Sequence, residues 1–173
     1  YENIGVIYDS SDAYSSGIYE AFKTKMAELN VTYIEQSFDA ENNRDFSTQV
    51  EALKDCDVIF LPIYYTEAGL IARACSAKGC DAFLFGCDGL DGLNTVLDVN
   101  TIPQAITMLT HFDSTAANAK TFVENYTKKF GTDTLNQFGA SAYDCIYAIF
   151  GALKKAADAG KKLLYYFWNE PGV

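Results

Sequence analysis

The stretch Asp57-Val-Ile-Phe-Leu-Pro-Ile-Tyr-Tyr-Thr-Glu-Ala-Gly69 decides how the rest of the chain is interpreted. Its first part, Val58 to Ile63, is apolar without alternation, which is typical of a strand covered on both faces in a parallel sheet. Tyr64 and Tyr65 follow, and Thr66 is suited to cap a helix with an acidic residue in its first turn. The stretch therefore predicts a buried strand that delivers two tyrosines to the carboxyl edge of a sheet, where open α/β sheets bind ligands.

Strands and helices alternate on both sides of this stretch. Four further strands are expected, at Ile4–Tyr8, Val31–Phe38, Ala82–Gly86 and Ala105–Thr110. Helices are expected on the stripe Ile18, Phe22, Met26 and Leu29, on Phe46, Val50 and Leu53, from Thr66 to near Gly79, and briefly around Leu93 to Leu97. This pattern predicts an α/β three-layer sandwich with a mainly parallel five-stranded sheet in the order 2-1-3-4-5.

The alternation stops after Thr110. Two successive helices are expected, at Ser114–Phe130 and Gln137–Ala159, with no strand between them. The second carries an apolar side of Ala142, Ile146, Ile149, Phe150 and Leu153. Such a side needs a partner surface, which this sheet or another copy of the chain would supply. A last short strand is a candidate at Leu163–Trp168.

Composition excludes several classes of partner. The chain has 173 residues, enough for one ordinary domain, and a net charge of −10. An acidic chain without a Lys/Arg cluster is a poor candidate for nucleic acid or anionic membrane. No apolar run is long enough to cross a bilayer. The sequence opens directly on a strand, so an exported form would have lost its leader.

The cysteine pattern does not indicate a zinc site. There are five cysteines, an odd number without a Cys-x-x-Cys pair, and a single histidine, His111. Mostly buried free thiols are expected, with Cys56 and Cys145 in apolar contexts that fit this interpretation. Cys75 and Cys80 lie on either side of a predicted helix end, so a local disulfide stays open as an alternative.

Sequence templates for catalysis are absent. The chain has no G-x-S-x-G elbow, no P-loop and no G-x-G-x-x-G. No nucleophile stands at a spacing from His111 that would indicate a catalytic pair, so His111 is interpreted as a surface or hinge residue. We therefore expect no enzyme activity, no catalytic residue, no cofactor and no metal site.

Three expected loops at strand carboxyl ends carry residues suited to binding. They contain Tyr14, Tyr64 with Tyr65, and Asp88. Each has an ordinary structural explanation, because tyrosine packs in loops and Asp before Gly makes turns. Together they predict an aromatic and acidic surface at one sheet edge. Such a surface suits a small cation, such as an ammonium group held by a carboxylate and ring faces.

Several segments in a fixed order carry a family resemblance. They are Ile4-Gly-Val-Ile-Tyr-Asp, Tyr14-Ser-Ser-Gly17, Asp45-Phe-Ser-Thr-Gln-Val-Glu-Ala-Leu53, Tyr64-Tyr-Thr-Glu-Ala-Gly69, Phe85-Gly-Cys-Asp-Gly89, and Asn136-Gln-Phe with Ala142-Tyr-Asp-Cys-Ile-Tyr147. From Ile4 to Leu153 the chain resembles the second lobe of a type I periplasmic solute-binding protein. The resemblance is to the branched-chain amino-acid (Leu/Ile/Val) group that serves ABC transporters.

The resemblance implies a binding role and a site. Members clamp a ligand between two lobes, and the second lobe offers aromatic residues and an acid to the α-ammonium. Tyr14, Tyr64 and Asp88 match those positions, with Tyr65 beside them. Asp88 stands where the member compared has the longer Glu, so the reach to the ligand differs. An extracytoplasmic component that binds an amino acid or a similar small polar solute, with an ABC permease as its partner, is implied.

The resemblance also implies a division of the chain. Residues 1–110 would form the α/β ligand-binding lobe, and residues 111–162 two helices that in the family pack on the other lobe. Residues 163–173 would form a returning strand and tail. On this resemblance the first lobe would be missing ahead of Tyr1, and a homodimer through the C-terminal helices is an additional expectation.

Other classes share this pattern of strands and helices. A freestanding flavodoxin-like or receiver-like domain, with a redox or signalling role, is the main alternative. A receiver should have a Lys late in its sheet, and here the segment after the fifth strand reads Thr110-His-Phe-Asp. Ser10-Ser11 and Ser15-Ser16 only faintly resemble a flavin phosphate loop. A sensor or receptor ectodomain built on the same lobe is a third alternative.

Overall fold

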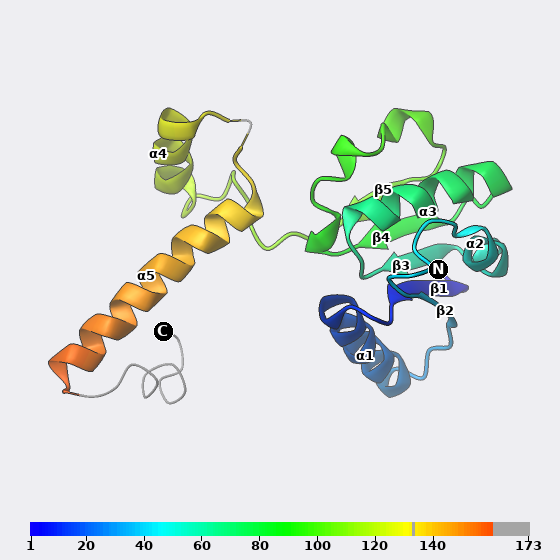
Figure 1. Cartoon of the computed structure of the whole chain (residues 1–173), viewed down its shortest axis with the longest axis horizontal. Helices are drawn as coiled ribbons and strands as arrows, with labels where there is room; N and C mark the ends of the chain where they lie inside the picture. Colours follow the sequence, from blue (N-terminus) through cyan, green and yellow to red (C-terminus); the bar gives the residue numbers. More distant parts are fainter. Residues whose placement is uncertain (133, 161–173) are drawn as a thin grey trace. The chain divides into compact units, whose positions relative to one another are not determined.

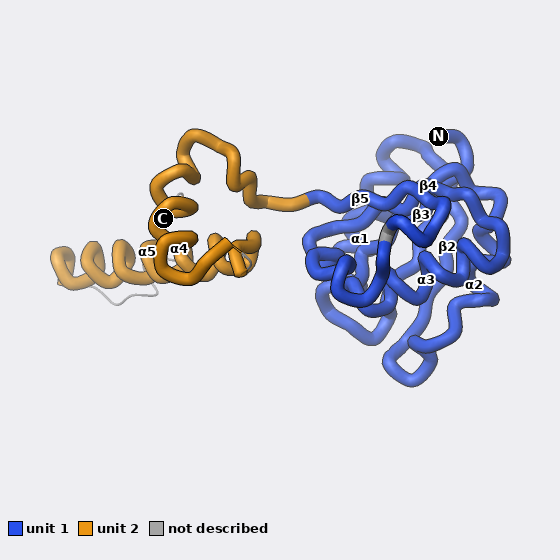
Figure 2. The backbone as a smooth tube through the Cα atoms, turned by 90° about the horizontal axis from the view of Figure 1, so that it is seen from above, with its two compact units in different colours: residues 1–109 blue, residues 110–173 orange. Residues whose placement is uncertain are grey.

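A computed structural model describes residues 1–132 and 134–160 of the chain. These residues fall into two compact units, the first from Tyr1 to Leu109 and the second from Thr110 onward (Figure 2). The candidate strand at Leu163–Trp168 lies outside the described residues.

The first unit is built on a five-stranded sheet. Its strands are β1 (Ile4–Asp9), β2 (Ile34–Phe38), β3 (Val58–Leu61), β4 (Phe83–Gly86) and β5 (Ile106–Met108). Their order is β2-β1-β3-β4-β5, and each neighbouring pair is parallel. The predicted fold class and strand order are therefore confirmed. Because all strands run the same way, their carboxyl ends meet at one edge.

Helices cover both faces of this sheet. They are α1 (Ala13–Glu28), α2 (Ser47–Leu53) and α3 (Tyr65–Lys78), followed by the 3₁₀ turns η1 (Asp88–Leu90), η2 (Leu93–Thr95) and η3 (Val99–Thr101). Figure 1 shows α1 on one side of the sheet and α2 with α3 on the other. The short helix expected around Leu93 is thus a single 3₁₀ turn.

The apolar core lies mainly between the sheet and the α2–α3 layer. Ile59, Leu61 and Leu84 of the central strands are fully buried there with Ile71 of α3. Burying each of these side chains stabilises the fold by about 1.5–3 kcal/mol. Residues between them face α1, where the Phe60 ring lies 5.1 Å from the ring centroid of Phe22. A strand covered on both faces needs no polar alternation, which explains the apolar run in β3.

Strand β2 is shorter at its start than predicted. It pairs with β1 in a register that places Gly5 opposite Ile34. Extending that register would place residues 31 and 32 opposite Glu2 and Asn3, whose backbone N–H groups donate instead to the Asp57 carboxylate. The β-branched side chains of Val31 and Thr32 favour a strand, but these two residues do not pair with β1.

The start of α1 differs from the prediction. The helix begins at Ala13, earlier than the expected apolar stripe, because Asp12 caps it and accepts a hydrogen bond of 2.8 Å from the Ser15 backbone N–H. Tyr14 therefore lies in the first turn of a helix and not in a loop. Its position is fixed by the helix backbone.

The capping role predicted for Thr66 is wrong. Tyr64 occupies the N-cap position of α3 with an extended backbone and makes no side-chain capping bond, so Thr66 lies inside the helix. Glu67 does lie in the first turn, as predicted. Gly79 ends the helix in the left-handed conformation, at a φ of 67°.

The second unit contains two helices, α4 (Lys120–Phe130) and α5 (Gln137–Asp158). The predicted start of α4 at Ser114 is wrong. Asp113 accepts hydrogen bonds from both the backbone and the hydroxyl of Thr115, and such local bonds favour turns over a continuous helix. Asn136 caps α5 through a 2.9 Å hydrogen bond from the Gly139 N–H.

The apolar side of α5 is exposed. Ile146 and Phe150 are each 65% exposed, and Ile149 and Leu153 are also exposed. None of the helices in the described ranges is both long enough and apolar enough to cross a membrane.

All five cysteines are free thiols. Cys56, Cys75 and Cys80 are buried, which agrees with the expectation for Cys56. The expectation for Cys145 is wrong, because this residue is exposed on α5. Its apolar neighbours in the sequence belong to the helix side that is itself exposed.

Gly86, the last residue of β4, lies directly against the side chain of Leu90. A methyl group there would collide with the buried side chain of Leu90. Gly86→Ala should therefore lower the free energy of unfolding by about 1–3 kcal/mol. Gly17→Ala is the matched control, because Gly17 is in α1 with open space around it. That substitution should be neutral or stabilise by up to about 1 kcal/mol. Urea denaturation measures both, and equal effects would contradict this packing.

Candidate ligand site

Three residues meet at the carboxyl edge of the sheet. Tyr14 lies in the first turn of α1, which follows β1; Tyr64 is the N-cap of α3, which follows β3; and Asp88 begins η1 just after β4. Neighbouring parallel strands thus deliver each of them to the same edge.

The Tyr14 hydroxyl joins these segments. It donates a 2.7 Å hydrogen bond to Asp88 Oδ1 and accepts a 2.9 Å hydrogen bond from the Gly89 backbone N–H. The rings of Tyr14 and Tyr64 stack, with centroids 5.0 Å apart and an interplanar angle of 25°. The structure therefore brings together Tyr14, Tyr64 and Asp88, which come from three separate parts of the sequence.

The site is accessible and acidic. The Tyr64 side chain is 47% exposed, whereas Tyr14 and Asp88 are half-buried. Burial and then the hydrogen bond to Asp88 raise the pKa of Tyr14. The pKa of Tyr64 is also raised, first by burial and then by the charges of Asp12 and Asp88. Both phenols therefore keep their protons at neutral pH, and the surrounding field favours a positive group.

This arrangement can hold an ammonium group. A carboxylate supplies acceptor oxygens, and aromatic faces attract a cation through their quadrupole. The Tyr14 hydroxyl orients Asp88 from one side. The exposed face of Tyr64 is open to a ligand.

Tyr65 is placed differently from the other three predicted residues. It is the first residue of α3, and it packs against the apolar core. Its ring lies beside Gly92, where an added Cβ would come within 3.3 Å of the Tyr65 ring. Among the described residues, no ring contact joins Tyr65 to Tyr14 or Tyr64.

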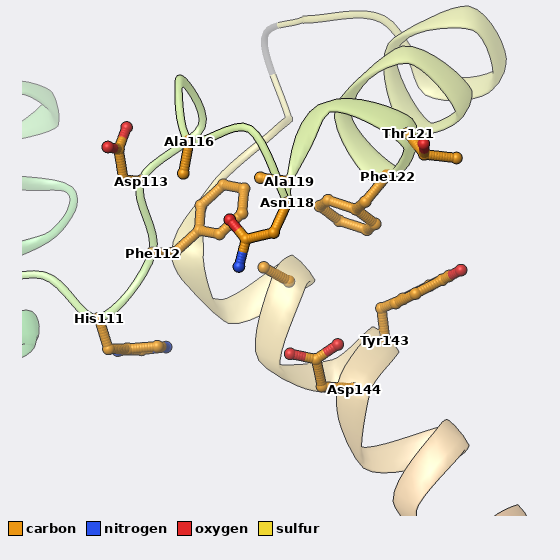
Figure 3. Close-up of a pocket in the computed structure, with 11 residues that line it drawn as sticks. His111, Phe112, Asp113, Ala116, Asn118, Ala119, Thr121, Phe122, Tyr143 and Asp144 are labelled. Carbon is orange, nitrogen blue, oxygen red and sulfur yellow. The ribbon is translucent and has the colours of Figure 1, made fainter.

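A separate pocket of about 520 Å³ lies within the second unit. Figure 3 shows His111, Phe112, Asn118, Tyr143 and Asp144 around it. Sequence patterns carry little signal for this pocket, because its walls come from a turn segment and from two helices. Of these residues, only His111 is weighed as a possible catalytic group from the sequence.

His111 has a partner that its sequence spacing did not reveal. Its Nε2 lies 2.5 Å from Ser141 Oγ, thirty residues away on α5. A hydrolytic triad also needs an acidic group that holds the other imidazole nitrogen. No such bond to His111 occurs within the described ranges, so this pair does not form a triad there.

Metal binding has no candidate in the described part of the chain. No group of three or more His, Cys, Asp or Glu side chains is arranged there to hold an ion.

Comparison with known proteins identifies the family. The periplasmic binding protein family matches residues 1–163, and the chain belongs to that family. A Leu/Ile/Val-binding protein homolog from Brucella melitensis is 30% identical over 91 residues, which cover 51% of this chain and 24% of that protein.

Solved structures show the same architecture. A leucine binding protein from Thermotoga maritima has a TM-score of 0.78 and 25% identity, over 90% of this chain and 45% of that one. A branched-chain amino acid transporter substrate binding protein from Streptococcus pneumoniae, in complex with isoleucine, has a TM-score of 0.70 and 25% identity, over 87% and 44%. The chain thus spans less than half of these structures. The match confirms one lobe of a type I periplasmic-binding-protein fold and favours the solute-binding interpretation over a flavodoxin-like or receiver-like domain.

The hydroxyl of Tyr14 should contribute measurably to stability. Tyr14→Phe keeps the ring but removes a donor to Asp88 and an acceptor for the Gly89 N–H, at a cost of about 1–3 kcal/mol. Tyr65→Phe is the matched control, because the Tyr65 hydroxyl makes no hydrogen bond within the described residues; its effect should stay within about 0.5 kcal/mol. Urea denaturation of both variants measures the difference. A Tyr14→Phe protein as stable as the control would show that this hydroxyl does not hold the site together.

Proposed function

We propose that the chain forms the second lobe of an extracytoplasmic solute-binding protein that serves an ABC transporter. Its ligand is an amino acid or a similar small polar solute. The observation that carries this proposal is the hydrogen bond between Tyr14 and Asp88, with the Tyr64 ring stacked beside it. Family membership supports it, as does the similarity to a Leu/Ile/Val-binding protein homolog and to a branched-chain amino acid transporter substrate binding protein.

In this proposal Asp88 accepts a charge-assisted hydrogen bond from the α-ammonium of the ligand. Tyr14 orients the carboxylate, and Tyr64 covers the apolar side of the ammonium group. Tyr65 packs on the apolar core and so helps to hold the carboxyl edge of the sheet in place. The chemistry needed is binding and not catalysis, and the chain itself supplies these polar groups without a cofactor.

The remainder of the ligand would be held by a first lobe. One lobe alone leaves much of a ligand exposed to water, so it should bind weakly. Residues 1–110 serve as the ligand-binding lobe, and the helices in residues 111–162 pack on the first lobe. The exposed apolar side of α5 supports this division, because so many exposed apolar side chains on one helix indicate an interaction surface. The complete protein would deliver its ligand to an ABC permease.

The charge of Asp88 provides the direct test of this role. In the full-length two-lobed protein, Asp88→Asn keeps the size of the side chain but leaves the ammonium without its counter-charge in a closed cleft. Affinity for amino acids should fall by about 2–5 kcal/mol, which is roughly 30-fold to several thousand-fold. Titration calorimetry with leucine, valine and polar amino acids measures it.

Asp81→Asn is the charge-matched control for this experiment. Asp81 is exposed and precedes β4, so it lies at the opposite edge of the sheet from Asp88. Affinity should be unchanged in this variant. If Asp88→Asn binds as tightly as Asp81→Asn, the assignment of the ammonium site is wrong.

The exposed side of α5 should also drive self-association when the first lobe is absent. We propose that the isolated chain forms a homodimer through this side. Light scattering over a concentration series should show it, and the double variant Ile146→Glu, Phe150→Glu should be monomeric because it places charges in the apolar interface. Lys155→Glu changes an exposed charge on the opposite side of the same helix and should still dimerise. A monomer at every concentration in the unmodified chain would contradict the homodimer.

A further inference from the structure

The C-terminal end of α3 has a specific backbone pattern. Gly79 is left-handed, the Cys80 N–H donates a 3.0 Å hydrogen bond to the Cys75 carbonyl, and the Gly79 N–H donates a longer one, 3.5 Å, to Ser76. These two bonds define a Schellman motif. In that motif the residue after the left-handed glycine contacts the residue five positions before it, usually through apolar side chains. Here the two residues in contact are both cysteines.

The two thiols are buried together. Cys75 and Cys80 are each fully buried in the core. Burial, followed by the nearby Cys80 thiol, raises the pKa of Cys75, and Cys80 lies within hydrogen-bonding reach of it. The backbone hydrogen bond joins the two residues, and their thiols are within hydrogen-bonding reach of each other, so the pair is a candidate for a disulfide.

We infer that Cys75 and Cys80 form a disulfide when the protein is exposed to a small-molecule disulfide oxidant. This bond closes a covalent loop across the end of α3. When the end of α3 opens locally and exposes the two thiols, one cysteine loses its proton to water and its thiolate attacks a low-molecular-weight disulfide such as oxidised glutathione. This attack forms a mixed disulfide and releases one glutathione thiolate, which takes up a proton. The second cysteine, as its thiolate, then attacks the mixed disulfide and releases a second glutathione. Two S–H bonds of the protein are replaced by one S–S bond, and one oxidised glutathione becomes two reduced molecules.

Cys56 is the competing thiol. It is 6% exposed and precedes β3, and burial first and then the neighbouring Cys80 raise its pKa. It has no backbone hydrogen bond to either cysteine in the described part of the chain, whereas Cys75 and Cys80 are held together by one. The Schellman geometry therefore selects the 75–80 pair over a pair with Cys56.

The cross-link would act on the helix that carries part of the ligand site. α3 starts next to Tyr64 and ends at Gly79, so a disulfide at its far end restrains fraying of the helix. An oxidising extracytoplasmic compartment would favour its formation. The inference itself rests on this helix end and does not depend on which ligand binds.

Disulfide mapping of the whole chain tests the inference. The reduced protein is incubated with oxidised glutathione, its remaining thiols are alkylated under denaturing conditions, and the product is cleaved with trypsin. Cleavage after Lys78 separates Cys75 from Cys80, so a disulfide leaves the two peptides joined. We expect this joined species, a higher urea midpoint than the reduced protein, and faster formation at higher pH, because the reacting form of a thiol is its thiolate.

Single substitutions identify the partner of Cys75. The peptide that carries Cys80 also carries Cys87, so Cys87→Ala and Cys56→Ala should keep the linkage while Cys80→Ala should abolish it. The mapping of the unmodified protein decides the question even if a variant folds poorly. Peptides that stay separate after oxidation, or a linkage from Cys56 to Cys80, would overturn the inference.

Discussion

The hydroxyl of Tyr14 is the point on which the candidate site depends. It donates to Asp88 and accepts from the Gly89 N–H, so it joins the first turn of α1, which follows β1, to η1, which follows β4. These strands are not neighbours, because β3 lies between them. The bond can form only because all three strands are parallel and end at one edge. The common direction of the strands thus sets the geometry of the candidate site.

A second constraint is that the residue after Asp88 is a glycine, Gly89, which has no side chain. A Cβ on Gly89 would lie 2.6 Å from the Ile63 carbonyl oxygen and 2.9 Å from the Tyr14 hydroxyl. Glycine therefore lets η1 approach both the end of β3 and Tyr14. This close approach is what brings Asp88 within reach of Tyr14. The same short segment thus contributes to packing and to the candidate site, and the Asp88 carboxylate is positioned by the fold itself.

Much of the sheet could be predicted because its signals are local and agree with one another. The apolar run in β3 and the regular alternation of strands and helices leave few arrangements for a right-handed parallel sheet. The convergence of Tyr14, Tyr64 and Asp88 followed from the same rule. Their order along the chain matched the ends of strands in one sheet.

What could not be predicted depends on the path of the backbone. Thr66 is a good capping residue, but Tyr64 has the extended conformation that starts the helix, so the side-chain preference had no role. Tyr65 is adjacent to Tyr64, yet it turns toward the core because the first turn of a helix points successive side chains in different directions. The contact of His111 with Ser141 depends on how a turn segment folds against α5, for which the sequence has no periodic signal.

An NMR titration of the full-length protein, labelled with ¹⁵N and with ¹³C in its tyrosine rings, with unlabelled amino acids tests the central claim most directly. The Gly89 amide is bonded to the Tyr14 hydroxyl and follows Asp88, so it reports on the site without any substitution. The account predicts that the Gly89 amide resonance is among those that shift most, together with the ring resonances of Tyr14 and Tyr64. Binding that leaves Gly89 unchanged and shifts only resonances from the pocket around His111 would contradict it.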